Sequence, residues 1–151
     1  MNYEFLRKND AGLTLVEALL SIAAIGIIVG IAAPLYQSFQ VRNDLDIATV
    51  TLAHGLRRAS VLATAVDGDT SWGVQTHSGA ITLFKGVSYA ARDVTFDEVF
   101  EMPASIAPSG VIEVVFAKFT GLPQTTGTMT LTSTSNETRT ITINAKGMVA
   151  Y

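Results

Sequence analysis

The chain has 151 residues, of which 48% are hydrophobic and only 15% charged, with a net charge of -3 and no cysteine. Soluble domains usually carry about 25% charged residues, so part of this chain is expected to lie away from water. The lack of cysteine excludes disulfides, zinc–thiolate sites, iron–sulfur clusters and thiol nucleophiles. Residues 36–151 hold eight Lys and Arg against ten Asp and Glu, which argues against nucleic-acid binding by bulk positive charge.

The first predicted element is a long apolar helix near the N-terminus. No charged residue occurs from Ala18 to Val41, and Ile, Leu, Val, Ala and Gly dominate the run. At about 1.5 Å per residue, such a helix is long enough to cross a hydrocarbon core of about 30 Å. Arg7 and Lys8 precede it, which predicts a cytoplasmic N-terminus and places the bulk of the chain outside. A cleavable secretory signal fits less well, because its apolar region usually has only about 7–15 residues.

One carboxylate, Glu17, stands near the start of this run. A carboxylate in a membrane helix costs about 3 kcal/mol near the midplane and normally has a partner, yet the helix contains no Lys, Arg or His. Either Glu17 is hydrated at the interface or another molecule supplies a cation. A cut between Gly12 and Leu13 would create an α-amino group about one turn away, which a neighbouring subunit's carboxylate could bind in low dielectric.

The stretch RKNDAGLTLVEALLSIAAIGIIVGIAAPLYQSF resembles the N-terminus of type IV prepilins and type II secretion pseudopilins. That family has a short basic leader, a Gly before the cut, an apolar first mature residue and a Glu at the fifth mature position. Gly12, Leu13 and Glu17 match this pattern in register, and Pro34 falls where many pilins carry a helix-kinking proline. The usual first mature residue is Phe, so Leu13 is a departure.

The resemblance implies a path of processing and assembly. Residues 1–12 would be a leader that an inner-membrane prepilin peptidase removes before it methylates the amino group of Leu13. Residues 13–36 would be a transmembrane helix in lipid of the bacterial inner membrane, and later a filament-core helix. Glu17 would pair with the N-terminus of an adjacent subunit as the assembly platform extracts the protein into a pilus or pseudopilus. Residues 37–151 would form the amphipathic half of the helix and a β-rich head outside the membrane.

Three residues of the apolar run disfavour a regular helix: Gly26, Gly30 and Pro34. A glycine costs about 1 kcal/mol in a helix interior and a proline about 3 kcal/mol. Membrane helices tolerate them where a kink or local unwinding is useful, and this part of the helix melts and extends in filaments of the family that the chain resembles. Close packing of helices through small residues is an equal alternative.

Beyond Tyr36 the pattern becomes amphipathic. Apolar residues recur at spacings of three and four, namely Leu45, Ala48, Leu52, Leu56, Ala59, Ala63 and Val66. This spacing predicts one helix from about Leu13 to Val66 with a single buried face. The sequence Asp67–Gly68–Asp69 then predicts a turn, and the adjacent Arg57 and Arg58 are expected on the solvated face.

After residue 70 the sequence favours β-structure, because short runs rich in Val, Ile, Thr and aromatic residues alternate with Gly, Pro, Ser and Asn. The predicted strands are Trp72–Gln75, Ala80–Phe84, Glu98–Met102, Val111–Ala117, Gly127–Thr134, Arg139–Asn144 and Met148–Tyr151. The acidic stretch RDVTFDEVFE is expected to keep an exposed segment soluble. The pattern predicts an α+β fold with a long N-terminal helix packed on a C-terminal antiparallel β-sheet head, and the resemblance named above implies that this fold is pilin-like.

The order of four short stretches resembles GspH/FimT-type pilin-like proteins: LRRASVLA, SWGV, VVFAKFTGLP and TRTITINAKGMV. This favours a minor pilin or minor pseudopilin, assembled with other subunits. The alternative is a DNA-binding minor pilin of an uptake pilus, but Met148 replaces the basic residue that commonly follows the last Gly, and only Arg139 and Lys146 lie nearby. A third possibility is an anchored domain that never assembles. No nucleophile elbow, phosphate loop or metalloprotease motif is present, so we expect neither catalysis nor a cofactor.

Overall fold

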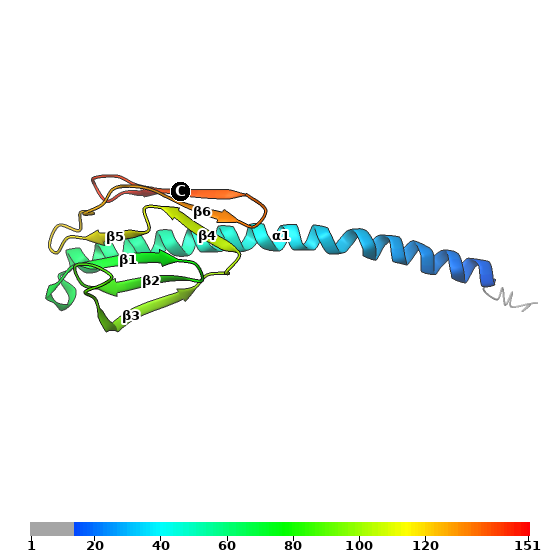
Figure 1. The fold of residues 1–151 in the computed structure, drawn as a ribbon, viewed down its shortest axis with the longest axis horizontal. Coiled ribbons are helices and arrows are strands. Elements are labelled where there is room, and N and C mark those ends of the chain that lie inside the picture. The colour runs from blue at the N-terminus through cyan, green and yellow to red at the C-terminus, as the bar shows by residue number, and fades with distance from the viewer. Residues whose placement is uncertain (1–13) are drawn as a thin grey trace, which may run out of the picture. The chain divides into compact units, whose positions relative to one another are not determined.

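The computed structural model describes residues 14–151, apart from the side chains of residues 32–35. The chain divides into two units, of which the first ends at Gln37 and the second is Ser38–Tyr151, and one helix, α1 (Leu15–Thr64), belongs to both (Figure 1). The predicted helix is thus confirmed over its described length, and it ends at Thr64 rather than at Val66. Leu13 and the leader proposed at 1–12 lie outside the described residues.

In the first unit, α1 is apolar all round its circumference. Each of its large hydrophobic side chains between Leu15 and Ile31 is at least 58% exposed. The helix is long and apolar enough to cross a membrane, by length and composition. A helix with no polar face cannot lie stably on the surface of a water-soluble domain, so lipid or other helices are its natural surroundings.

The second unit, the head, holds the C-terminal half of α1 and two antiparallel sheets (Figure 1). The first sheet has the order β3-β2-β1-β5, formed by β1 (Trp72–His77), β2 (Ala80–Lys85), β3 (Asp93–Glu101) and β5 (Glu113–Phe116). The second has the order β4-β6-β7-β8, formed by β4 (Ile106–Gly110), β6 (Gly127–Ser133), β7 (Thr138–Ile143) and β8 (Val149–Ala150). The α+β class is confirmed, with two sheets where a single one was expected.

The strands that differ from the predicted ones lie at the edges of the two sheets. Strand β4 was not predicted, because its sequence IAPSG contains Pro108. Proline lacks a backbone donor and is found in sheets mainly on edge strands, and β4 is such an edge. Strand β3, also an edge, begins at Asp93 rather than at Glu98 and is mostly exposed, as expected for the acidic stretch. The last strand, Val149–Ala150, is shorter than the predicted Met148–Tyr151.

The core of the head lies between α1 and both sheets. The helix contributes the predicted face, with Leu45, Ala48, Leu52, Leu56, Ala59 and Ala63 all at most 4% exposed. The first sheet adds Trp72, Val74, Ile81, Leu83, Val114 and Phe116, and the second adds Ile106, Met129, Leu131, Ile141 and Ile143. Val66 does not continue the helical face. Its φ of 58° is left-handed, and it precedes the 3-10 turn η1 (Asp67–Asp69) that ends the helix.

Candidate functional site

Glu17 occupies the first turn of α1. Its backbone N–H donates to Thr14 Oγ1 at 3.2 Å, and its carbonyl oxygen accepts from Ser21 Oγ at 2.7 Å. Thr14 and Glu17 thereby have the spacing of a helix capping box, and the acidic side chain lies where the helix dipole favours negative charge. The ion pairs among residues 14–151 all lie in the head and none includes Glu17. Its charge is therefore available to a cation from another molecule.

The two glycines of the apolar half lie on open helix surface. A Cβ atom added at Gly26 or at Gly30 would have no neighbour within 4 Å. Packing within the chain therefore does not require glycine at either position, which leaves helix unwinding and contact with another helix as explanations. α1 continues through residue 34, but the side chain of Pro34 lies outside the described residues.

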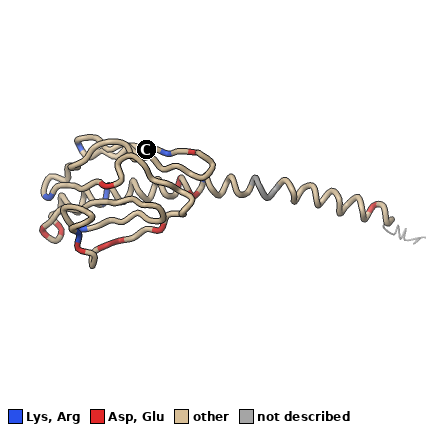
Figure 2. The backbone as a smooth tube through the Cα atoms, in the orientation of Figure 1, with Lys and Arg blue, Asp and Glu red and all other residues tan. Residues whose placement is uncertain are grey.

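The basic residues of the head are largely neutralised. Five of the eight Lys and Arg in residues 36–151 form ion pairs, namely Arg42–Glu137, Arg58–Glu98, Arg92–Asp97, Lys118–Asp69 and Arg139–Asp46. Two further cations lie over aromatic rings, Arg57 on Tyr151 and Lys85 on Phe96. Acidic and basic positions are consequently interspersed over the head (Figure 2), and the described residues form no continuous basic stripe.

The acidic segment of β3 is also accounted for by internal contacts. Arg92 Nε donates to Asp97 Oδ2 at 2.8 Å, and this bond raises the pKa of Arg92 above its ordinary value. Hydrogen bonds from the hydroxyl and the backbone N–H of Thr95 lower the pKa of Asp93. With Glu98 paired to Arg58, three acids of this segment already have partners. We find no group of three or more His, Asp and Glu side chains within residues 14–151 that could hold a metal ion.

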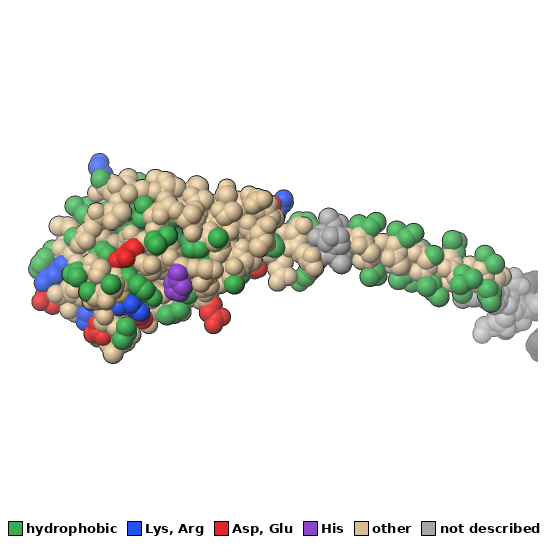
Figure 3. All heavy atoms as spheres, viewed as in Figure 1, with side chains coloured by type: hydrophobic (Ala, Val, Ile, Leu, Met, Phe, Trp, Pro, Cys, Tyr) green, Lys and Arg blue, Asp and Glu red, His purple; other side chains and the backbone are tan. Residues whose placement is uncertain are grey.

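Two shallow depressions flank α1 in the head. One, of about 310 Å³, is lined by Val50, Thr51, His54, Gly55, Arg58 and Phe100. The other, of about 370 Å³, is lined by Asp46, Thr49, Val50, Thr138, Arg139, Thr140 and Tyr151. The first depression holds both Thr51 and His54, but no hydrogen bond joins their side chains and no third residue of the described chain orients His54, so the arrangement of a catalytic nucleophile and its base is not formed. Hydrophobic side chains cover the apolar half of α1 on the face in view, whereas the head shows a mixed surface (Figure 3).

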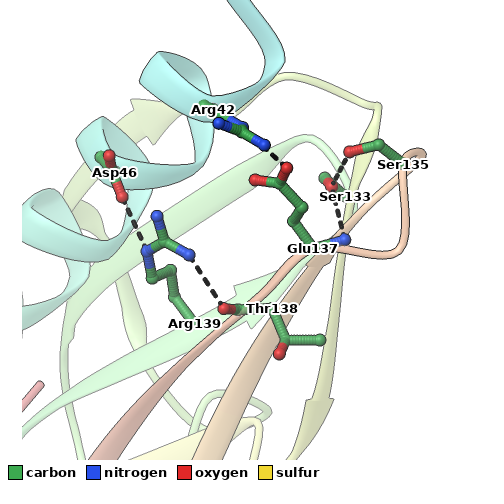
Figure 4. Close-up of polar contacts among 7 residues, drawn as sticks. All are labelled: Arg42, Asp46, Ser133, Ser135, Glu137, Thr138 and Arg139. Atoms are coloured by element: carbon green, nitrogen blue, oxygen red, sulfur yellow. Dashed lines mark hydrogen bonds and ion pairs between the residues drawn. The ribbon is translucent and has the colours of Figure 1, made fainter. Parts of the chain in front are cut away.

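A contact that sequence reasoning missed joins the β6–β7 hairpin to α1 (Figure 4). Arg42 Nε lies 2.7 Å from Glu137 Oε1, and Arg139 Nε lies 2.8 Å from Asp46 Oδ1. Arg139, considered above as a DNA ligand, is therefore engaged with a carboxylate. The available signal was a pair of opposite charges one turn apart on the helix, which share a face, together with a second pair two residues apart at the start of β7, where Glu137 directly precedes the strand and Arg139 lies in it.

Comparison with known proteins adds two findings. Residues 7–33 match the family model described as the prokaryotic N-terminal methylation motif. Among solved structures, the chain is similar to the type IV minor pilin FimU of Pseudomonas aeruginosa, with a TM-score of 0.55 and 18% identity over 74% of this chain and 90% of that one. At this identity the likeness concerns the fold alone. No curated protein shows significant sequence similarity to the chain.

Proposed function

We propose that this chain is a structural subunit and not an enzyme, namely a minor pilin or minor pseudopilin of a type IV pilus or a type II secretion-type filament. The match to an N-terminal methylation motif and the fold likeness to a type IV minor pilin support this proposal. The observation that carries the proposal is the first half of α1. It is apolar and exposed on every side, and Glu17 is its single charged residue between Leu15 and Ile31.

Processing is the first step of this proposal. A prepilin peptidase in the inner membrane cuts between Gly12 and Leu13 and methylates the new amino terminus. The match of residues 7–33 to a methylation motif supports this step. Before the cut, the apolar helix holds the protein in the membrane with the N-terminus in the cytoplasm, as Arg7 and Lys8 favour.

Assembly is the second step. The carboxylate of Glu17 binds the N-terminal amine of an adjacent subunit, and the apolar helix exchanges lipid for neighbouring helices. Two opposite charges attract more strongly in such a low-dielectric setting than in water. Gly26, Gly30 and Pro34 form the segment of α1 that unwinds during the transfer, and the open space around both glycines supports their freedom to do so.

A minor subunit is favoured over the abundant one. The order of the GspH/FimT-like stretches along the head supports this assignment, as does the fold likeness to a protein that is itself a minor pilin. DNA binding, the alternative function, has no support in the described residues, because most of the cations in the head face carboxylates or aromatic rings.

The decisive experiment is intact-mass and N-terminal peptide analysis of the protein extracted from its native membrane. We expect a chain that begins at methylated Leu13, and an uncut chain when the prepilin peptidase is deleted. An uncut chain in cells with an active peptidase would reduce the protein to an anchored domain. A cut beyond Ala33 would instead identify an ordinary secreted protein.

Assembly is tested separately by the Glu17→Gln variant, which keeps the size of the side chain and removes its charge. We expect at least a tenfold loss from sheared filaments with normal leader cleavage. Ser21→Ala is the matched control, since it removes a polar group one turn further along and leaves the charge intact. Filaments that contain Glu17→Gln at the wild-type level would contradict the assigned role of Glu17.

A gel-shift assay with duplex DNA at about 150 mM salt tests the alternative. We expect no binding tighter than the 10⁻⁴–10⁻⁶ M that is typical of non-specific contacts. Tighter binding that is lost in an Arg139→Ala, Lys146→Ala double variant would favour a DNA-uptake role instead.

A further inference from the structure

Two ion pairs join α1 to the β6–β7 hairpin, and the helix supplies the cation of one pair and the anion of the other (Figure 4). The helix presents a cation, Arg42, and one turn later an anion, Asp46. The hairpin presents an anion, Glu137, and two residues later a cation, Arg139. The helical spacing puts Arg42 and Asp46 on one face of α1. Glu137, directly before β7, and Arg139, within it, both reach that face, as the two ion pairs show. The two pairs therefore hold the hairpin in a single register along the helix, because a shift in either direction would bring like charges together.

The hairpin side of this contact is organised in advance. Ser133 N donates to the Glu137 carbonyl oxygen at 2.9 Å, and Glu137 N donates to Ser133 Oγ at 3.2 Å. The hydroxyls of Ser133 and Ser135 lie 2.9 Å apart, and Arg139 Nη1 donates to the Thr138 carbonyl oxygen at 3.1 Å. Isolated surface ion pairs gain little, partly because two mobile side chains must be ordered. A turn that is already fixed lowers that entropic cost for Glu137 and Arg139.

The contact lies where α1 changes from exposed to buried. The compact head begins at Ser38, the side chains of residues 38–40 are exposed, and Leu45 is the first fully buried residue among the described side chains of α1. Helices without tertiary packing are only marginally stable in water. Any unwinding that starts in the exposed part of α1 and moves toward the head must therefore pass Arg42 before it reaches Leu45, and Asp46 is the next residue along the helix.

We propose that these two ion pairs form a clamp, the hairpin clamp, which flanks Leu45 and stops the unwinding of α1 where the helix enters the core. The clamp divides the helix into a part that can rearrange when the subunit leaves the membrane and a part that stays with the head. Its role in a filament rests on the proposed assembly function, whereas its effect on the helix does not.

The test is hydrogen–deuterium exchange of the full chain in detergent micelles, followed by mass spectrometry. Reversing one charge, by Arg42→Glu or by Glu137→Arg, is expected to accelerate exchange of the amides of residues 40–46 by about 2- to 5-fold, the size expected for one such pair. The double variant, which restores opposite charges, is expected to bring exchange at least halfway back. Lys146→Glu is the matched control, since Lys146 has no ion pair among the described residues.

Unchanged exchange in both single variants, or a double variant as fast as the singles, would overturn the clamp. Amides of residues 50–58 report on the head itself. If they also accelerate, the charge reversal has disturbed the head, and two milder tests replace it: the neutral variant Glu137→Gln, and a second cycle with Asp46→Arg, Arg139→Asp and their double variant. The clamp then requires faster exchange of the amides of residues 40–46 in the single variants and at least half recovery in the double variant. Because no filament is needed, a failure here leaves the assembly proposal standing, and a failure of Glu17→Gln to block assembly leaves the clamp standing.

Discussion

Replacing Gly121 with alanine tests how the head closes the C-terminal end of α1. The loop after β5 returns to the helix there: Phe119 N donates to the Ala63 carbonyl oxygen at 3.1 Å, and Ser60 Oγ donates to the Gly121 carbonyl oxygen at 3.0 Å. The last four carbonyls of a helix lack partners within it. The carbonyl oxygen of Ala63 accepts from Val66 N at 3.2 Å, and this loop gives it a second donor. Gly121 holds the turn together, with its N–H bonded to the Ala117 carbonyl oxygen at 2.9 Å.

The expected cost has two parts. Gly121 has a φ of +60°, a left-handed conformation that costs an L-residue about 1–2 kcal/mol. An added Cβ would also lie 2.9 Å from the Ser60 carbonyl oxygen and closer still to the Thr64 hydroxyl. The first of these atoms belongs to the helix backbone and cannot move freely, and overpacking of this kind costs about 1–3 kcal/mol. The variant should therefore lose about 2–5 kcal/mol of its free energy of unfolding.

Gly79→Ala is the matched control, because Gly79 has a φ of +94° but no atom within 4 Å of an added Cβ. It should lose only the conformational part, about 1–2 kcal/mol. Urea unfolding of the full chain in detergent can be followed by the fluorescence of Trp72, the single tryptophan, which is 5% exposed. If Gly121→Ala loses no more than Gly79→Ala, the loop is not held against α1 and the explanation of the helix end is wrong.

Three further outcomes are expected. In the same urea assay, Leu52→Ala should lower the free energy of unfolding by about 2–5 kcal/mol, because Leu52 is fully buried in the core. Val61→Ala should change it by less than about 0.5 kcal/mol, because the side chain of Val61 is 65% exposed. Arg58→Ala should cost less than about 1 kcal/mol, since both partners of its ion pair are well exposed, and a larger loss would mean that the pair is better shielded from solvent than its exposure indicates. NMR titration should find the pKa of Asp93 below its ordinary value, and Thr95→Ala should raise it. Because the folded pKa is lowered, the stabilisation from Asp93 is present above the unfolded pKa and is lost as the pH falls through the folded one.

The local features of this protein could be predicted from its sequence because they depend on neighbours along the chain. The apolar run around Glu17 is visible as composition, and the buried face from Leu45 to Ala63 is visible as a helical period. The β6–β7 hairpin is visible as alternation between aliphatic residues and threonines, with the turn at Asn136, whose φ is 60°. The methylation motif, which overlaps the first turn of α1, is likewise a property of consecutive residues.

Only the tertiary structure decided which distant segments meet. It divided the strands into two sheets, turned IAPSG into the edge strand β4, and brought Arg42 and Asp46 opposite Glu137 and Arg139. It also left Glu17 without an ionic partner among the described residues and placed Phe119 N on the end of α1. The charge or β-propensity of a residue shows that it can form an ion pair or a strand, but not with which partner. A period of two or 3.6 residues shows only which face of its own element a residue lies on, whereas the partner depends on how the helix and the sheets pack together.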